Sequence, residues 1–123
     1  LLAIMLCASF GVIRLQAQTL SEKEKIQQLE MQRETERQRA LRVKLDSAIA
    51  LVEAANYEAA DEKLRVVLKN LRSVPSELAF YVGKNSFHLQ RYKQSIDWLN
   101  KYIQLKGTAG QFSTQAVDLL KQS

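Results

Sequence analysis

Cysteine and histidine are almost absent from this sequence: Cys7 and His88 are the single examples of each in 123 residues. Without a further cysteine, no disulfide can form within the chain and no thiolate zinc site can be built. No glycine-rich phosphate loop and no Gly-x-Ser-x-Gly pattern is present either, and His88 has no second histidine at metal-ligand spacing. The sequence therefore predicts no enzyme, no cofactor and no metal site, with His88 as a surface or groove residue.

Proline and glycine are also scarce, at one and four residues. Both residues interrupt helices, so their scarcity favours long helices with short connections. No convincing run of alternating apolar and polar residues rich in Val, Ile and Thr is present, and such runs are the signal for strands. An all-α fold follows from these two absences.

No long block of a single charge sign occurs, although the formal net charge is +5 and the pI about 9.5. Basic and acidic side chains are interspersed both in residues 21–45 and in residues 46–123. Phosphate binding favours clustered Lys and Arg, so the distribution predicts an ordinary solvated surface and no nucleic-acid partner. A basic helical nucleic-acid binder remains as the weaker alternative.

The longest apolar run, residues 1–13, is shorter than the roughly 20 residues that a membrane-spanning helix requires. It fits the apolar core of a secretory signal peptide, and the small residue Ala17 follows it. We expect residues 1–17 to be removed, which would leave a secreted or periplasmic protein of the bacterial envelope with no stable membrane span. An uncleaved membrane anchor and a buried helix remain the alternatives, and in each case Cys7 lies in this segment.

Residues 18–45 form a charged segment rich in Glu, Gln, Lys and Arg, all of which favour helices. Ser21 followed by Glu24 is typical of a capping box and predicts a helix start at Ser21. Apolar residues are too sparse for a sustained coiled coil. We expect an exposed helix, with weak self-association through residues 21–45 at Ile26 and Leu29.

Apolar residues recur every three to four positions from Leu41 onward, which predicts amphipathic helices. Asn56 interrupts the first helix, Pro75 separates the second from the third, and Gly107 ends the fourth. Ser76 is predicted to cap the third helix. The expected later helices span residues 57–71, 77–89, 92–105 and 111–122.

An internal repeat is visible at a spacing of 35 residues, with Tyr57 matching Tyr92, Ala60 matching Ser95 and Ala48 falling on Gly83. Small residues on the first helix, an aromatic opening the second and a small residue three positions later resemble the tetratricopeptide repeat family. The resemblance covers residues 41–107. It departs from the family at Lys44 and Ser47, where large apolar residues are usual. Another antiparallel helical hairpin array remains the alternative.

The resemblance implies a domain at residues 46–123 made of antiparallel helix pairs stacked as a short α-solenoid. One repeat covers about residues 41–75, a second about 76–109, and a partial third repeat or cap 110–123. In this family the first helix of each pair lines a concave groove that binds peptides or protein surfaces. The implied function is a non-catalytic protein-protein interaction scaffold or assembly factor of the cell envelope; an accessory domain of a larger protein is the alternative.

The resemblance also implies which residues line the groove, and partner proteins are the only class of ligand it suggests. Aromatic and cationic side chains anchor many interfaces, which places Phe80, Tyr81 and Lys84 at the centre of the expected site. Burial of Phe80 by the preceding repeat is the alternative. The full set of candidates from the two first helices is Arg42, Asp46, Ile49, Glu53, Glu77, Phe80, Tyr81, Lys84 and His88.

Overall fold

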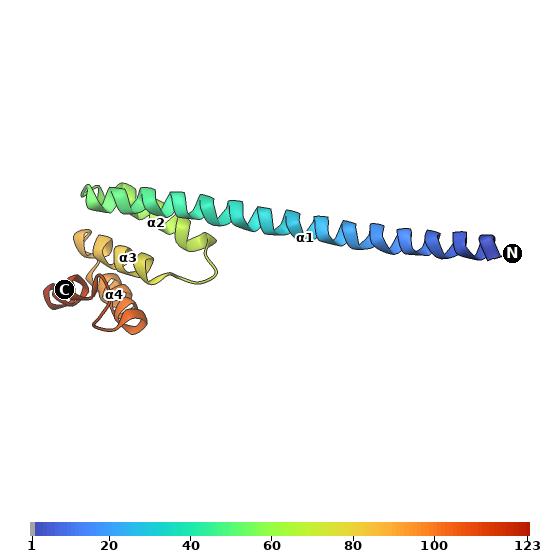
Figure 1. Ribbon diagram of the computed structural model, residues 1–123. Coiled ribbons are helices and arrows are strands. Elements are labelled where there is room, and N and C mark those ends of the chain that lie inside the picture. Colours follow the sequence, from blue (N-terminus) through green and yellow to red (C-terminus); the bar gives the residue numbers. More distant parts are fainter. Residues whose placement is uncertain (1) are drawn as a thin grey trace. The chain divides into compact units, whose positions relative to one another are not determined.

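The computed structural model describes the backbone of residues 2–123 and the side chains of residues 21–123. This part of the chain is all-α, as predicted, and no strand occurs in it. Its helices are α1 (Leu2–Glu53), α2 (Tyr57–Asn70), α3 (Ser76–His88), α4 (Tyr92–Lys106) and α5 (Ser113–Gln122) (Figure 1). The signal-peptide prediction concerns residues 1–17, whose side chains lie outside the described ones.

The chain divides into two units, Leu1–Arg39 and Ala40–Ser123, which we describe separately. In the first unit, α1 continues through the charged segment, and every described side chain from residue 21 to residue 39 is exposed. The predicted helix start at Ser21 is wrong, because α1 has no break there and Ser21 lies inside the helix. Because the helix continues before Ser21, the amides that a cap would serve bond to carbonyls of the preceding turn.

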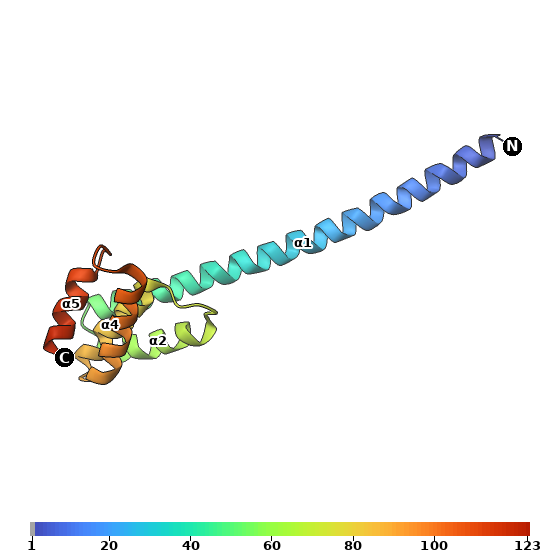
Figure 2. The same cartoon turned by 90° about the horizontal axis from the view of Figure 1, so that it is seen from below.

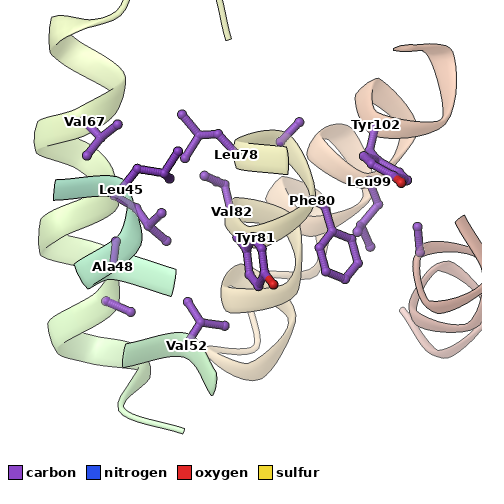
Figure 3. Packing of buried hydrophobic residues seen from close by; sticks show 14 residues of the cluster. Leu45, Ala48, Val52, Val67, Leu78, Phe80, Tyr81, Val82, Leu99 and Tyr102 are labelled. Atoms are coloured by element: carbon purple, nitrogen blue, oxygen red, sulfur yellow. The ribbon is translucent and has the colours of Figure 1, made fainter. Parts of the chain in front are cut away.

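The second unit has one hydrophobic core, to which all five helices contribute (Figure 3). Amphipathic periodicity places one apolar stripe of each helix toward it, and burial of these side chains is the main stabilising contribution. Figure 3 shows Leu78 and Val82 on the side of α3 that meets α1 and α2, whereas Phe80 lies on the side of α4. The most deeply buried members are Ala48, Val52, Ala60, Leu64, Val67, Leu78, Ala79, Phe80, Leu99, Tyr102 and Ala116.

Small residues are buried at equivalent positions of the two helix pairs. Ala48 of α1 and Ala60 of α2 are both fully buried. At the equivalent place in the second pair, the Ser95 hydroxyl donates a 2.8 Å hydrogen bond to the Gly83 carbonyl. A Cβ atom added to Gly83 would lie 2.7 Å from Leu99 Cγ, closer than carbon atoms approach in proteins. The second pair is therefore packed through small side chains, as the sequence predicts, and in the first pair the equivalent residues are buried alanines.

The turn that joins the two helices of a pair has the same backbone conformation in both pairs. Ala55 and Gln90, 35 residues apart, have φ values of 61° and 62°. The following residues match as well, with φ −93° and ψ 69° at Asn56 and φ −91° and ψ 67° at Arg91. The Asn56 amide donates to Leu51 and the Arg91 amide to Ser86, each over 2.9 Å. The 35-residue spacing seen in the sequence thus recurs in backbone geometry.

The turn between α4 and α5 holds α5 against α4 (Figure 2). Gly107 ends α4 with a φ of 63°, in the left-handed region that glycine adopts without strain. The Phe112 amide donates to the Tyr102 hydroxyl over 2.8 Å, and the Ser113 hydroxyl donates to the Gly107 carbonyl over 2.8 Å. These bonds satisfy turn groups that the helices leave unpaired.

The predicted helix ends need two corrections. Ser76 is the first residue of α3, Pro75 occupies the capping position, and no side chain caps the helix. Proline fixes its own φ and supplies no amide, so it is compatible with the start of a helix, although it offers no acceptor to the first amides of α3. The last helix begins at Ser113 instead of residue 111, because Gly110 to Phe112 form the turn.

Candidate functional site

The predicted groove residues come from the last part of α1 and from α3, which pack side by side in the second unit. On α1 they are Arg42, Asp46, Ile49 and Glu53, and on α3 they are Glu77, Phe80, Tyr81, Lys84 and His88. We name the solvent-facing members of this set (Arg42, Asp46, Glu53, Glu77, Lys84 and His88) the α1–α3 face. Its charged side chains form two groups, one near each end of α3.

The first group is centred on Arg42. Its guanidinium lies 2.9 Å from the Asp46 carboxylate, one turn along α1, and 2.9 Å from the Glu77 carboxylate on α3. The hydrogen bond that Arg42 donates to Glu77, followed by the charges of Glu77 and Asp46, raises the pKa of Arg42. Arg42 is 56% exposed, so solvent screens these pairs and they add little to stability.

The second group joins Glu53 of α1 to Lys84 and Tyr81 of α3. The Lys84 ammonium lies 3.4 Å from the Glu53 carboxylate. Burial, and then the negative charge of Glu53, raise the pKa of the Tyr81 hydroxyl. The Tyr81 hydroxyl, which is protonated at neutral pH even at the ordinary tyrosine pKa, thus remains a hydrogen-bond donor.

Phe80 does not belong to the α1–α3 face, and its prediction as a partner contact is wrong. Its side chain is fully buried. The ring stacks on Phe112 at 4.4 Å between centroids, with an interplanar angle of 4°, and packs beside Tyr102 at 5.6 Å. Helices α4 and α5 cover this side of α3, so Phe80 is a core residue. The alternative prediction, burial of Phe80, is therefore right, but the covering helices follow Phe80 in the sequence instead of preceding it.

Tyr81 is also largely withdrawn from solvent, at 7% exposure. Its ring packs edge-on against Phe80 and Phe112, at 5.2 and 5.4 Å between centroids. The prediction that Tyr81 anchors a partner through its ring is therefore wrong as well. Its buried position leaves Lys84, Glu53 and His88 as the accessible residues at this end of the face.

His88, the last residue of α3, is exposed and stacks on Tyr57, the first residue of α2. The two rings are 4.3 Å apart and nearly parallel, with an interplanar angle of 9°. Desolvation, and then the positive charge of Lys84, lower the pKa of His88. The neutral imidazole is thus the favoured form at neutral pH, which suits stacking on a phenol ring.

Asn85 is a buried polar residue of α3 that sequence reasoning missed. Its side-chain amide donates a 3.1 Å hydrogen bond to the Tyr57 carbonyl and so ties α3 to the start of α2. The side chain is 1% exposed, and its oxygen has no hydrogen-bond partner among the described residues. Asn85 stands on the apolar side of a helical pattern, and a buried polar residue in that position is the signal that could have found it.

A second surface lies on the outer side of α1 and α2 and explains two departures from the resembled family. At the 35-residue spacing, Lys44 and Ser47 correspond to Ala79 and Val82, both of which are buried in the core. Lys44 is exposed, and Ser47 is only partly buried, with the Lys63 ammonium of α2 donating to its hydroxyl over 2.7 Å. A shallow hollow of about 480 Å³ is lined there by Val43, Lys44, Ser47, Glu62, Lys63 and Val66.

The groups present offer contact chemistry: charged side chains, an imidazole and a phenol. Within the part of the chain whose side chains are described, no cluster of three His, Cys, Asp or Glu residues could hold a metal ion. Among the described helices, none combines the length and the apolar character that crossing a membrane requires. No protein-family model, no curated protein and no solved structure matches the sequence.

Proposed function

We propose that this chain is a non-catalytic scaffold or assembly factor that binds a partner protein through the α1–α3 face. The observation that carries the proposal is the gathering of six accessible polar side chains, from two helices, on one side of a well-packed array. Arg42, Asp46 and Glu53 come from α1, and Glu77, Lys84 and His88 come from α3. A rigid scaffold that holds several charges in fixed positions favours recognition of a complementary surface.

The ion pairs of the face do not prevent binding. Surface ion pairs contribute roughly 0–1 kcal/mol, so exchanging Arg42–Glu77 or Lys84–Glu53 for contacts with a partner costs little. Both signs of charge are present at each end, so the fitting partner is a protein surface or peptide with mixed charges. A polyanion fits this face poorly, because the carboxylates of Asp46, Glu53 and Glu77 would repel it.

We further propose that the array is built of tetratricopeptide-like repeats. Support comes from the matched turns at Ala55 and Gln90 and from the small-residue contacts at Gly83 and Ser95. In such an array the first helix of each pair faces the binding groove, which agrees with the choice of α1 and α3. The proposal also includes export: cleavage after Ala17 would place the protein in the bacterial cell envelope.

A site-specific photo-crosslinker tests the binding proposal. Two variants of the full chain carry it on the face, at Asp46 and at Lys84. Two matched controls carry it at exposed positions of the second helices, at Glu58 and at Lys93. After irradiation in the native host, both face variants should give one adduct of the same mass, and mass spectrometry should identify the same protein in both. The controls should give no such adduct.

Charge reversal supplies the second arm of this experiment. Lys84→Glu places a second carboxylate beside Glu53 and should reduce the Asp46 adduct by about tenfold. Its free energy of unfolding should fall by no more than about 1 kcal/mol, because the Glu53 carboxylate is 53% exposed and solvent screens the pair. Equal adducts from the face and control positions, or none from the face, would contradict the proposal.

A further inference from the structure

The charged part of α1, residues 21–39, presents an apolar patch that no described residue covers. Ile26 and Leu29 are 56% and 53% exposed, although both are large aliphatic residues. Five acidic and five basic side chains surround them and balance in charge: Glu22, Glu24, Glu30, Glu34 and Glu36 against Lys23, Lys25, Arg33, Arg37 and Arg39. A charge-balanced segment has no preference for a polyanion or an anionic membrane, which leaves a protein helix as the covering element.

Four residues of this segment form a stripe along one side of the helix: Glu22, Ile26, Leu29 and Arg33. They follow one another at spacings of 4, 3 and 4 residues. In a helix of about 3.6 residues per turn, this spacing keeps all four within an arc of about 60°. The same spacing forms the contact seam of paired helices. The stripe is apolar at its centre, acidic at one end and basic at the other.

We propose that this stripe pairs with the same stripe of a second copy of the chain, with the two helices antiparallel. In this register Ile26 lies opposite Leu29 of the second copy, and Leu29 lies opposite its Ile26. The acidic end then meets the basic end twice, with Glu22 opposite Arg33 of the second copy. Lys23, beside the stripe, falls next to Glu30 of the second copy, so these flanking charges match as well.

The parallel orientation lacks this complementarity along the stripe. It sets Glu22 against Glu22 and Arg33 against Arg33 of the second copy, and juxtaposed like charges oppose association. The apolar contact is the same in both orientations, because each brings two Ile and two Leu side chains together. The charges at the ends of the stripe therefore select the antiparallel pair.

The expected dimer is weak and salt-dependent. Two aliphatic side chains per chain form a much smaller contact than stable dimers have. The four charge pairs lie at the surface, where salt at 1 M reduces the screening length to about 3 Å. Association should therefore be seen at low ionic strength and high protein concentration, and should weaken as salt is added.

Sedimentation velocity of the full chain, over a range of concentrations at low salt, tests the apolar centre of the stripe. Ile26→Gln should raise the dissociation constant of the dimer by about tenfold or more, because it removes half of the aliphatic contact. Met31→Gln is the matched control: Met31 is 69% exposed and lies about 140° around the helix from Ile26. Met31→Gln should leave the dissociation constant unchanged. Equal effects of the two substitutions, or a monomer under all conditions, would overturn the proposal.

Charge reversal tests the orientation. Glu22→Arg sets a cation opposite Arg33 of the second copy in the antiparallel pair and should weaken association by about tenfold. Adding Arg33→Glu to that variant restores opposite charges and should restore association. In a parallel pair, Glu22→Arg exchanges one like-charge contact for another, and the second change rescues nothing. Failure of the double variant to recover would reject the antiparallel register.

Discussion

Gly83 of α3 lies directly against Leu99 of α4, with space for a hydrogen atom and not for a methyl group. A Cβ atom at residue 83 would lie 2.7 Å from Leu99 Cγ and 3.2 Å from the Leu99 amide nitrogen. The Ser95 hydroxyl, one turn before Leu99 on α4, is bonded to the Gly83 carbonyl and stabilises the same contact. The close approach of α3 and α4 thus depends on the absence of a side chain at one position.

Replacing this glycine should destabilise the protein. We expect Gly83→Leu to lower the free energy of unfolding by roughly 1–3 kcal/mol, because a well-packed core accommodates extra atoms poorly. Chemical denaturation measures the change. Gly83→Ala in the wild-type and in a Leu99→Ala background is the control: without the leucine side chain only the 3.2 Å contact with the amide of residue 99 remains, so alanine should cost less stability there than in the wild-type background. A Gly83→Leu variant as stable as the wild type would show that the two helices do not meet here.

Replacing Gln90, which has a left-handed backbone conformation in the turn between α3 and α4, with glycine should stabilise the protein. Its φ of 62° strains a residue that carries a Cβ atom, whereas glycine adopts this conformation freely. Gln90→Gly should raise the free energy of unfolding by about 0.5–1 kcal/mol, measured by urea denaturation.

Gln104, an exposed residue inside α4, provides the matched comparison. Gln104→Gly should destabilise by about 1 kcal/mol, since glycine is a poor helix former. If Gln90→Gly lowers the free energy of unfolding as Gln104→Gly does, the left-handed conformation at Gln90 is contradicted.

Protonation of His88 should weaken the fold. Its pKa is lowered in the folded state, so the unfolded chain binds the proton more readily below the ordinary value of about 6.5. The contribution of neutral His88 to the free energy of unfolding is therefore present above that pH and is lost as pH falls below it. In thermal melts between about pH 7.5 and 5, His88→Gln should therefore show a smaller loss of stability than the wild type.

Lys84 offers a check on the cause of this pH dependence. Its positive charge is the second contribution to the lowered pKa of His88. Lys84→Gln should move the imidazole pKa upward, as followed by the NMR shifts of the ring protons. If the pKa of His88 instead falls in this variant, the assigned electrostatic cause is wrong.

Much of the helical framework could be predicted from sequence, because turn chemistry is local. Gly107 and Pro75 end or separate helices through their own backbone geometry, and the observed boundaries of α2 to α5 lie within two residues of the expected ones. The continuity of α1 through Ser21 could not be predicted in the same way. A capping pattern is also compatible with a helix interior when helix formers stand on both sides.

The candidate site was predicted less well, and Phe80 shows why. The consecutive residues from Leu78 to Val82 are all buried, since α1 and α2 cover one side of α3 while α4 and α5 cover another. Periodicity identifies an apolar stripe but does not say how many helices will surround it. The ion pairs Arg42–Glu77 and Lys84–Glu53 join residues more than 30 positions apart, and only the packed structure brings them together.

Arg42 and Glu77, which form one of these pairs, are 35 residues apart and hold equivalent places in successive repeats. The charges at this place therefore follow a fixed order along the array, because a cation in one helix pair bonds to an anion in the next. A tandem duplication of the first repeat would set arginine against arginine, and would also bury Lys44 where Ala79 now packs. An engineered lengthening of the protein must alternate these signs and replace Lys44, so the order of its repeats is not interchangeable.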